Sequence, residues 1–308
     1  MTTIAFIGLG HMGRPMAANL ATAGFDVRGF DLVPELCDAA RAAGIAISGS
    51  APEAAAEADI VITMLPAGKH VLAVYGDVDA PGLLAAARPG TLFLDCSTIA
   101  VDEARSAAER AVAAGHRALD APVSGGVVGA EKGTLAFMVG GEDADFEAAK
   151  PALTAMGGRI VHCGGAGLGQ AAKVCNNMIL GVTQIAVAEA FVLGERLGLS
   201  HQALFDVASN ASGQCWALTT NCPVPGPVPT SPANNAYEPG FAGALMAKDL
   251  GLAEQMIAHT GVDAQLGLLA QSLYADFAAG AGATKDFSAI IETIREESAE
   301  PRAGVPAE

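Results

Sequence analysis

The sequence predicts an α/β fold, in which a doubly wound parallel sheet is followed by a second, all-α domain built on a long central helix. The first half alternates short apolar or β-branched runs with Ala-rich helical segments, the pattern of a parallel sheet covered by helices. After about Gly164 the strand-like runs stop and long helical segments begin. We therefore expect a sheet domain over residues 1–163, a helical domain over 164–295 and a disordered tail over 296–308.

Eight segments of the first half have the length and composition of strands. They are Thr3–Gly8, Asp26–Phe30, Ile45–Ile47, Ile60–Met64, Thr91–Asp95, Arg117–Asp120, Ala136–Val139 and Ile160–Cys163. Glycines end three predicted helices between them, at Met12–Ala23, Pro34–Ala43 and Val101–Ala114. In the second half we expect a long helix from Gly169 to about Leu197, shorter ones at His201–Ser209, Phe241–Thr260, Ala264–Ala279 and Ser288–Glu297, and a proline-rich loop at Asn221–Gly240.

Composition excludes several classes of partner. Of 308 residues, 51% are hydrophobic and 16% charged, which predicts a large buried core. The net charge of −16 repels nucleic-acid phosphates and anionic lipid, so we expect neither a nucleic-acid nor a membrane partner. The most apolar run, Ile179–Leu193, contains Gln184 and Glu189 and is typical of a helix buried in a core or between subunits. Six cysteines without a C-x-x-C pair, and no signal peptide, indicate a reduced, cytoplasmic protein.

A glycine-rich motif follows the first predicted strand. The segment Gly8-Leu9-Gly10-His11-Met12-Gly13 matches G-x-G-x-x-G and opens a predicted helix. In sheets of the Rossmann type the first glycine makes the tight turn, the second lets a pyrophosphate approach the backbone, and the third lets the helix close on the strand. The helix N-terminus supplies amide donors to the phosphates. We predict that this loop binds a dinucleotide; the alternative is a tight turn without a ligand.

Asp31 ends the second predicted strand, 31 − 13 = 18 residues after the last motif glycine. This spacing is close to the roughly 20 residues expected for an acid that binds the cofactor ribose. A carboxylate accepts hydrogen bonds from a ribose 2′-hydroxyl and repels a 2′-phosphate, and no arginine stands in the adjacent Leu32-Val33-Pro34. The sequence therefore favours NAD over NADP.

Three further segments follow predicted strands, at the sheet edge where such folds bind ligands. Leu65-Pro66 follows the fourth strand and Ser97-Thr98 the fifth, although position alone is equally consistent with ordinary loop starts. After the sixth strand, Ser124-Gly125-Gly126 offers unobstructed backbone amides, a nest suited to a small carboxylate. Composition alone favours a structural turn there.

Lys173 is almost the only cation on the long apolar helix before Arg196. Three- and four-residue spacing places it on one helix face with Gln170 and Asn177. Burial favours the neutral amine and so allows proton exchange near neutral pH; the alternative is a lysine that reaches solvent. Lys248-Asp249 is a second charged pair in an apolar helix, and its spacing alone favours an exposed surface pair.

Together these motifs resemble the β-hydroxyacid dehydrogenases. The resemblance covers about residues 3 to 295 and rests on Phe6–Leu20, Asp120–Gly126, Gly167–Asn177 and Lys248-Asp249-Leu250. Within that family, Ser212–Trp216, Asn221–Gly226 and Ser231–Asn235 are most similar to the 3-hydroxyisobutyrate dehydrogenases.

The resemblance implies oxidation of 3-hydroxyisobutyrate to methylmalonate semialdehyde with NAD, in valine breakdown. It implies that Lys173 is the catalytic residue, that the substrate is bound by Ser124, Gly125, Gly126 and Asn177, and that the cofactor is contacted by Leu65, Pro66, His70, Thr98 and Lys248. His70 stands where the family commonly has asparagine. Lysine can polarise the carbonyl oxygen, so no metal is expected.

The same motifs also fit other functions. A tartronate or succinate semialdehyde reductase would share the same chemistry, and imine reduction on a similar scaffold is disfavoured by Lys173. A non-catalytic nucleotide-sensing protein is the alternative from another class. Because the long apolar helix favours pairing between subunits, we expect a homodimer or homotetramer.

Overall fold

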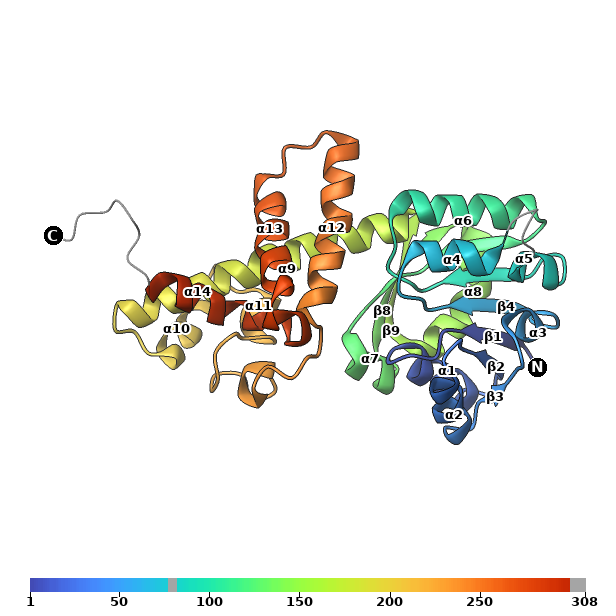
Figure 1. Cartoon of the computed structure of the whole chain (residues 1–308), viewed down its shortest axis with the longest axis horizontal. Helices are drawn as coiled ribbons and strands as arrows, with labels where there is room; N and C mark the ends of the chain where they lie inside the picture. Colours follow the sequence, from blue (N-terminus) through green and yellow to red (C-terminus); the bar gives the residue numbers. More distant parts are fainter. Residues whose placement is uncertain (77–81, 300–308) are drawn as a thin grey trace. The chain divides into compact units, whose positions relative to one another are not determined.

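The computed structural model describes residues 1–76 and 82–299 and forms two compact units, Met1–Lys173 and the chain from Val174 onward. The predicted boundary between residues 163 and 164 remains a prediction. Figure 1 shows a sheet with helices in the first unit, and the described part of the second unit, up to residue 299, contains helices and no strand.

The first unit contains a mostly parallel sheet, which confirms the predicted fold class. Its strand order is β3-β2-β1-β4-β5-β6-β8-β7, with β9 paired to β8. The six strands from β1 to β6 are parallel, whereas β8 runs antiparallel to β6 and β7. The bounds are β1 Thr3–Ile7, β2 Asp26–Phe30, β3 Ala46–Ile47, β4 Ile60–Thr63, β5 Leu92–Asp95, β6 Arg117–Asp120, β7 Val123–Ser124, β8 Leu135–Gly141 and β9 Gly157–Gly164.

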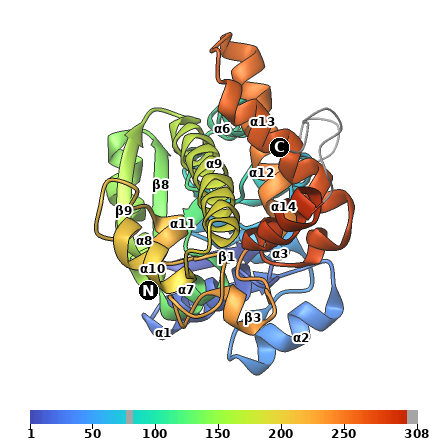
Figure 2. The same ribbon diagram turned by 90° about the vertical axis from the view of Figure 1, so that its left-hand side faces the viewer.

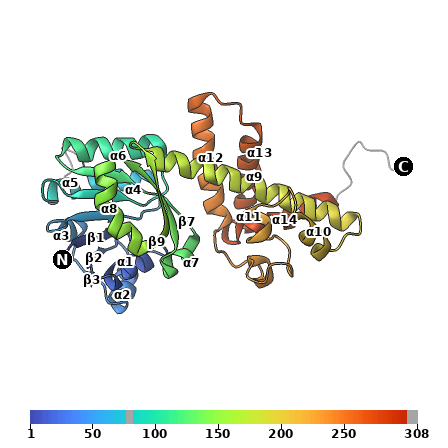
Figure 3. The same cartoon turned by 180° about the vertical axis from the view of Figure 1, so that it is seen from behind.

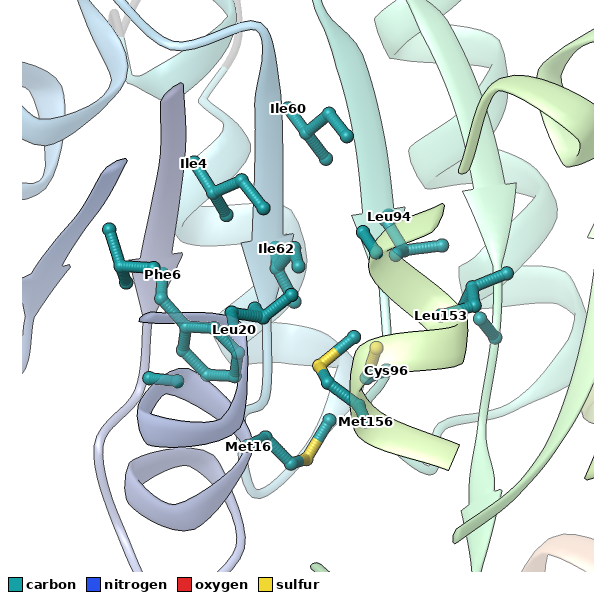
Figure 4. Packing of buried hydrophobic residues seen from close by; sticks show 14 of the residues in the cluster. Ile4, Phe6, Met16, Leu20, Ile60, Ile62, Leu94, Cys96, Leu153 and Met156 are labelled. Carbon is teal, nitrogen blue, oxygen red and sulfur yellow. The ribbon is translucent and has the colours of Figure 1, made fainter. Parts of the chain in front are cut away.

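Helices cover both faces of this sheet because its central strands are apolar on both sides. Along β1, Ile4 and Phe6 join a core with α1, α2 and α8, while Ala5 and Ile7 join a second core with α3 to α6. Figure 4 shows the first of these cores, in which Met16 of α1 and Met156 of α8 lie against strand side chains. The helix bounds are α1 Gly13–Thr22, α2 Pro34–Ala42, α3 Ala51–Ala55, α4 Gly68–Tyr75, α5 Leu83–Ala86, α6 Val101–Ala113, α7 Gly126–Lys132 and α8 Asp143–Met156.

The second unit is helical, as predicted. Helix α9 begins in the first unit and continues through the second as one unbroken helix (Figure 3). Figure 2 shows α12, α13 and α14 grouped together, and α12 and α13 are in contact along their lengths. The bounds are α9 Leu168–Arg196, α10 His201–Ala208, α11 Trp216–Thr219, η1 Pro232–Asn235, α12 Gly243–Thr260, α13 Gln265–Ala279, η2 Ala281–Thr284, η3 Phe287–Ala289 and α14 Ile290–Ala299.

The structure differs from the sequence expectation in three places. Strand β7 and helices α3, α4, α5, α7, α8 and α11 were not expected; α8 contains Pro151, which discourages a helix assignment. The proline-rich loop includes the short helix η1, and its Cys222, Val224 and Tyr237 are buried in the core of the second unit. Helix α14 extends to Ala299, so residues 296–299 of the expected disordered tail are helical, and 300–308 lie outside the described residues.

Helix α9 has the length and apolar composition of a membrane span, the only such helix among the described residues. The core helix of a globular protein passes the same test, and 44% of the most apolar window is already buried within this chain. Gln184 in its middle is fully buried and hydrogen-bonded to Asn221. These contacts favour a core helix.

Candidate active site

The glycine-rich loop joins β1 to α1 with the geometry that the motif predicts. Gly8 has φ +99°, a left-handed conformation that suits glycine. A Cβ atom at Gly13 would overlap the Gly8 carbonyl, so only glycine lets α1 approach the strand this closely. A Cβ at Gly10 would meet no atom within 4 Å, which leaves open space above the backbone where a pyrophosphate fits.

Asp31 lies directly after β2 and contacts this loop. Its Oδ2 atom accepts a hydrogen bond of 2.7 Å from the Leu9 amide, and its Oδ1 atom accepts one of 2.9 Å from the Val33 amide. The carboxylate is half-buried and is therefore also accessible to a ligand. The structure thus brings together the motif loop and the predicted ribose acid, while His11 beside them is exposed.

The ends of β4 and β5 are joined by a buried polar network. The Thr63 hydroxyl donates to Asp95 Oδ1 at 2.7 Å, and the Ser97 amide and hydroxyl donate to the same oxygen at 3.1 and 2.6 Å. The Leu65 amide in turn donates to Ser97 Oγ at 2.8 Å. This network holds the two predicted cofactor segments, Leu65-Pro66 and Ser97-Thr98, next to each other.

Asp95, at the end of β5, is a buried acid with a raised pKa. Burial raises its pKa from 3.8 to about 6, against the opposing effect of its hydrogen bonds to Ser97 and Thr63. Its Oδ2 atom is buried without a hydrogen-bond partner among the described residues. It lines a cavity of about 10 Å³ together with Tyr75 and Asp120, enough for about one water molecule.

The Ser124-Gly125-Gly126 segment lies where β7 meets α7. Gly125 precedes the helix with φ +131° and Gly126 opens it with φ +62°, so consecutive left-handed residues shape this turn. Gly125 is exposed, and Ser124 and Gly126 are half-buried. Accessible amides at a helix start are consistent with the predicted carboxylate nest.

The start of α9 is fixed to the sheet of the first unit. The amides of Gly167 and Gln170 donate to the two Asp120 oxygens, at 2.7 and 2.8 Å. Burial raises the pKa of Asp120, although these amides partly offset the rise. A Cβ at Gly169 would lie 2.7 Å from the Asp120 carbonyl, so the helix begins in close contact with the end of β6.

Lys173 follows one turn after Gln170, and both side chains are buried, with 6% and 0% of their surface exposed. The predicted polar face of α9 therefore points into the protein rather than to solvent. The nest strand β7 pairs with β8, and Gly140 of β8 packs against the start of α9. Strand β8 thereby links the two candidate substrate-binding elements of the first unit.

Asn177 and Lys248 belong to the second unit. Asn177 Nδ2 donates to Asp249 Oδ2 at 2.5 Å, and Lys248 Nζ lies 3.3 Å from Asp249 Oδ1. Asp249 is only 4% exposed, so the expectation of an exposed surface pair is wrong. Asp249 is buried because α12 turns this face toward α9.

The remaining predicted residues are placed as follows. Leu9 is buried, Met12 and Leu65 are half-buried, Pro66 is exposed, and His70 is exposed in the first turn of α4. Sequence reasoning missed Asp95 and the role of Gln170 in this region. Asp95 ends a predicted strand next to Ser97, and that position could have drawn attention to it.

Comparison with known proteins agrees with this geometry. Residues 3–165 match the NAD-binding domain of 6-phosphogluconate dehydrogenase, and residues 167–294 match the model described as NAD-binding of NADP-dependent 3-hydroxyisobutyrate dehydrogenase. A Mycobacterium bovis protein named "Probable 3-hydroxyisobutyrate dehydrogenase" is 61% identical over 96% of this chain and 98% of its own length. The NAD-dependent L-serine dehydrogenase of Pseudomonas aeruginosa is 48% identical over 94% of this chain and 97% of its own.

A solved structure also shows similarity to a 3-hydroxyisobutyrate dehydrogenase. The structure of Mycobacterium tuberculosis 3-hydroxyisobutyrate dehydrogenase with L-serine has a TM-score of 0.91 and 61% identity, covering 96% of this chain and 99% of that one. An imine reductase from Bacillus cereus has a TM-score of 0.62 at 18% identity over 96% of this chain and 99% of its own, a likeness of fold alone. This chain belongs to the 3-hydroxyisobutyrate dehydrogenase family of NAD-dependent hydroxyacid oxidoreductases.

Proposed function

We propose that this protein oxidises 3-hydroxyisobutyrate to methylmalonate semialdehyde with NAD, as a step of valine breakdown. The 61% identity to curated and solved 3-hydroxyisobutyrate dehydrogenases over nearly the whole chain supports the substrate. The structural observation that carries the proposal is the burial of Lys173 on α9, whose start is fixed at the carboxyl edge of the nucleotide-binding sheet.

The chemistry assigns a role to each group. NAD, when bound, supplies a nicotinamide ring that accepts a hydride from the hydroxyl-bearing carbon. Lys173 accepts the hydroxyl proton in oxidation and returns it in reduction. Ser124, Gly125 and Gly126 bind the carboxylate through their amides, which holds the reacting carbon in place, and Asn177 contacts the substrate one helical turn beyond the lysine.

Residues of the first unit hold the cofactor, and the family resemblance implies Lys248 as a further contact. The loop Gly8–Gly13 binds the pyrophosphate, Asp31 binds the ribose hydroxyls, and Leu65, Pro66, His70 and Thr98 contact the other half of the dinucleotide. The Asp31 carboxylate lies at the loop where a 2′-phosphate would be repelled, which supports NAD over NADP.

A second candidate substrate is L-serine, which is also a 3-hydroxy acid. It is supported by the name of the 48% identical Pseudomonas aeruginosa enzyme and by the L-serine in the Mycobacterium tuberculosis structure. We further propose that the protein works in the cytoplasm as a homodimer or homotetramer; its six cysteines, all among the described residues, are unpaired.

An initial-rate assay tests the function. We expect the highest kcat/KM for racemic 3-hydroxyisobutyrate with NAD, compared with 3-hydroxypropionate, L-serine and glycerate, and a lower value with NADP. Lys173→Met removes the proton acceptor while keeping an unbranched side chain of similar length, so kcat should fall about 100-fold or more. A circular dichroism melt confirms that the variant is folded. Near-normal turnover by folded Lys173→Met, or a preference for NADP, would contradict the proposal.

A further inference from the structure

The side chain of Gln170 joins α9 to the loop that follows β5. Its Nε2 atom donates a hydrogen bond of 2.7 Å to the Ser97 carbonyl, and its Oε1 atom accepts one of 3.3 Å from the Ile99 amide. These two partners flank Thr98 on both sides. Gln170 is fully buried, so water does not compete for either bond.

Both ends of this bridge are fixed. On the helix side, the Gln170 amide donates to Asp120 Oδ2 at the end of β6. On the loop side, the Ser97 amide and hydroxyl donate to Asp95 Oδ1 at the end of β5. The bridge therefore connects two points of the first unit that are themselves hydrogen-bonded to strand ends, and Lys173 lies one helical turn from one of them.

The strand order shows which part of the cofactor the Thr98 loop faces. In doubly wound sheets the dinucleotide lies across the point where the strand order reverses, one mononucleotide over each half. Here that point lies between β1 and β4. Asp31, the ribose acid, ends β2 on one side, so the loop after β5 belongs to the half that receives the nicotinamide.

We propose that Gln170 is a positioning residue, which holds the Thr98 loop, and through it the nicotinamide end of the cofactor, in register with Lys173. This inference rests on the proposed roles of Lys173 and Thr98. It assigns Gln170 no contact with substrate or cofactor. Its two hydrogen bonds set the relative position of the group that receives the hydride and the group that receives the proton.

A glutamine suits this role because it is both donor and acceptor. The Ser97 carbonyl needs a donor and the Ile99 amide needs an acceptor, and the planar amide group serves both at once. An apolar side chain would leave both backbone groups buried and unpaired, which lets the loop move to find other partners.

The test compares two buried glutamines of the same helix. Gln170→Met removes the bridge at little change in volume. Gln184→Met is the matched control, since Gln184 is equally buried on α9 and also makes two hydrogen bonds, both to Asn221. Both variants should lower the melting temperature, because each leaves backbone or side-chain groups unpaired.

Binding separates a positioning role from a structural one. We expect Gln170→Met to raise the Kd for NAD about tenfold, because the Thr98 loop is no longer held in the position that contacts the nicotinamide half, while the Kd for ADP-ribose, which lacks the nicotinamide, stays unchanged. Gln184→Met should change neither. Isothermal titration calorimetry measures both ligands without any turnover.

Kinetics gives the second readout. In Gln170→Met we expect kcat to fall about tenfold to a hundredfold, and the primary isotope effect with substrate deuterated at the hydroxyl-bearing carbon to rise, because misalignment slows hydride transfer. If Gln170→Met does not fold, Gln170→Asn keeps a neutral amide group but shortens the side chain by one methylene, so it cannot reach the Ser97 carbonyl and the Ile99 amide as Gln170 does. Its changes in kcat, isotope effect and Kd for NAD should have the same direction and be smaller.

The outcome that overturns the inference is equal behaviour of the two methionine variants, with lower stability but unchanged kcat, isotope effect and NAD affinity. Equal weakening of NAD and ADP-ribose binding would also overturn it, because the effect would then not be local to the nicotinamide. Failure of the proposed function is seen separately, as absent hydroxyacid turnover in the unmodified protein or full turnover by Lys173→Met.

Discussion

Asp95 ends β5 and is only 3% exposed, and burial raises the pKa of its carboxyl group from 3.8 to about 6. The folded state therefore binds this proton more tightly than the unfolded chain, in which the pKa is near 3.8. As the pH rises from about 4 to about 6, the unfolded chain releases its proton first. The contribution of Asp95 to stability is thus present at low pH and lost as the pH passes through about 6.

The pH dependence of this contribution to stability gives a prediction for Asp95→Asn. The amide is neutral at every pH, so the variant does not suffer this loss. The free energy of unfolding of the variant, relative to the unmodified protein, should rise by about 2 kcal/mol between pH 4 and pH 7. Urea unfolding at several pH values measures it. A difference that stays constant between pH 4 and pH 7 for Asp95→Asn would contradict the buried-acid interpretation.

At the scale of elements, two glycines of the turn from β1 to α1 have different roles: Gly13 is needed for close packing of the helix, and Gly10 leaves space for the cofactor. Gly13→Ala would place a methyl group on the Gly8 carbonyl, so we expect a loss of several degrees in melting temperature. Gly10→Ala meets no atom of the protein, so its melting temperature should stay within about 2 °C. Its methyl group occupies the pyrophosphate space, and the Kd for NAD should rise at least tenfold. Unchanged NAD affinity in Gly10→Ala would show that the dinucleotide does not approach this backbone.

Elements with a strong local signal were predictable from the sequence. The strands β1, β2, β4 and β5 lie in short β-branched or apolar runs of the sequence, and their positions were predicted to within about one residue. Helix α8 was not predicted, because Pro151 and a polar first turn interrupt the apolar pattern of a helix in the sequence. Its apolar face is apparent only in the structure, where it packs on β5 and β6.

In the candidate site, too, only features with a strong local sequence signal were predictable. The loop Gly8–Gly13 and Asp31 were predictable because one continuous motif encodes their geometry. The burial of Asp249 and the bridge made by Gln170 depend on partners 72 and 71 residues away, and no local pattern reports such contacts. The spacing of Gln170, Lys173 and Asn177 predicted a shared helix face but not what that face would touch.

At the scale of the molecule, the second unit leaves apolar surface uncovered. Ile179 and Leu193 of α9 are each 61% exposed, and Trp216 is 51% exposed. A groove of about 420 Å³ is lined by α9, α10 and the segment 212–218. Surface of this kind is typical of subunit interfaces, which supports the proposed homo-oligomer.

Sedimentation equilibrium tests the assembly. We expect a mass of two or four times 30.8 kDa, and Leu193→Glu, which places a charge on the apolar surface, should shift the distribution toward the single chain. Its kcat per folded chain should be compared with that of the unmodified protein, to learn whether assembly and turnover are linked. A single-chain mass for the unmodified protein at micromolar concentration would contradict the proposal.

The continuity of α9 bears on how members of this family can be recombined. The two units divide between Lys173 and Val174, inside a helix that carries the proposed proton acceptor on one side of the division and Asn177 on the other. A chimera spliced at that division would combine a lysine and an asparagine from different parents within one helical turn. A splice at residues 164–167, before the helix begins, takes both residues from the same parent.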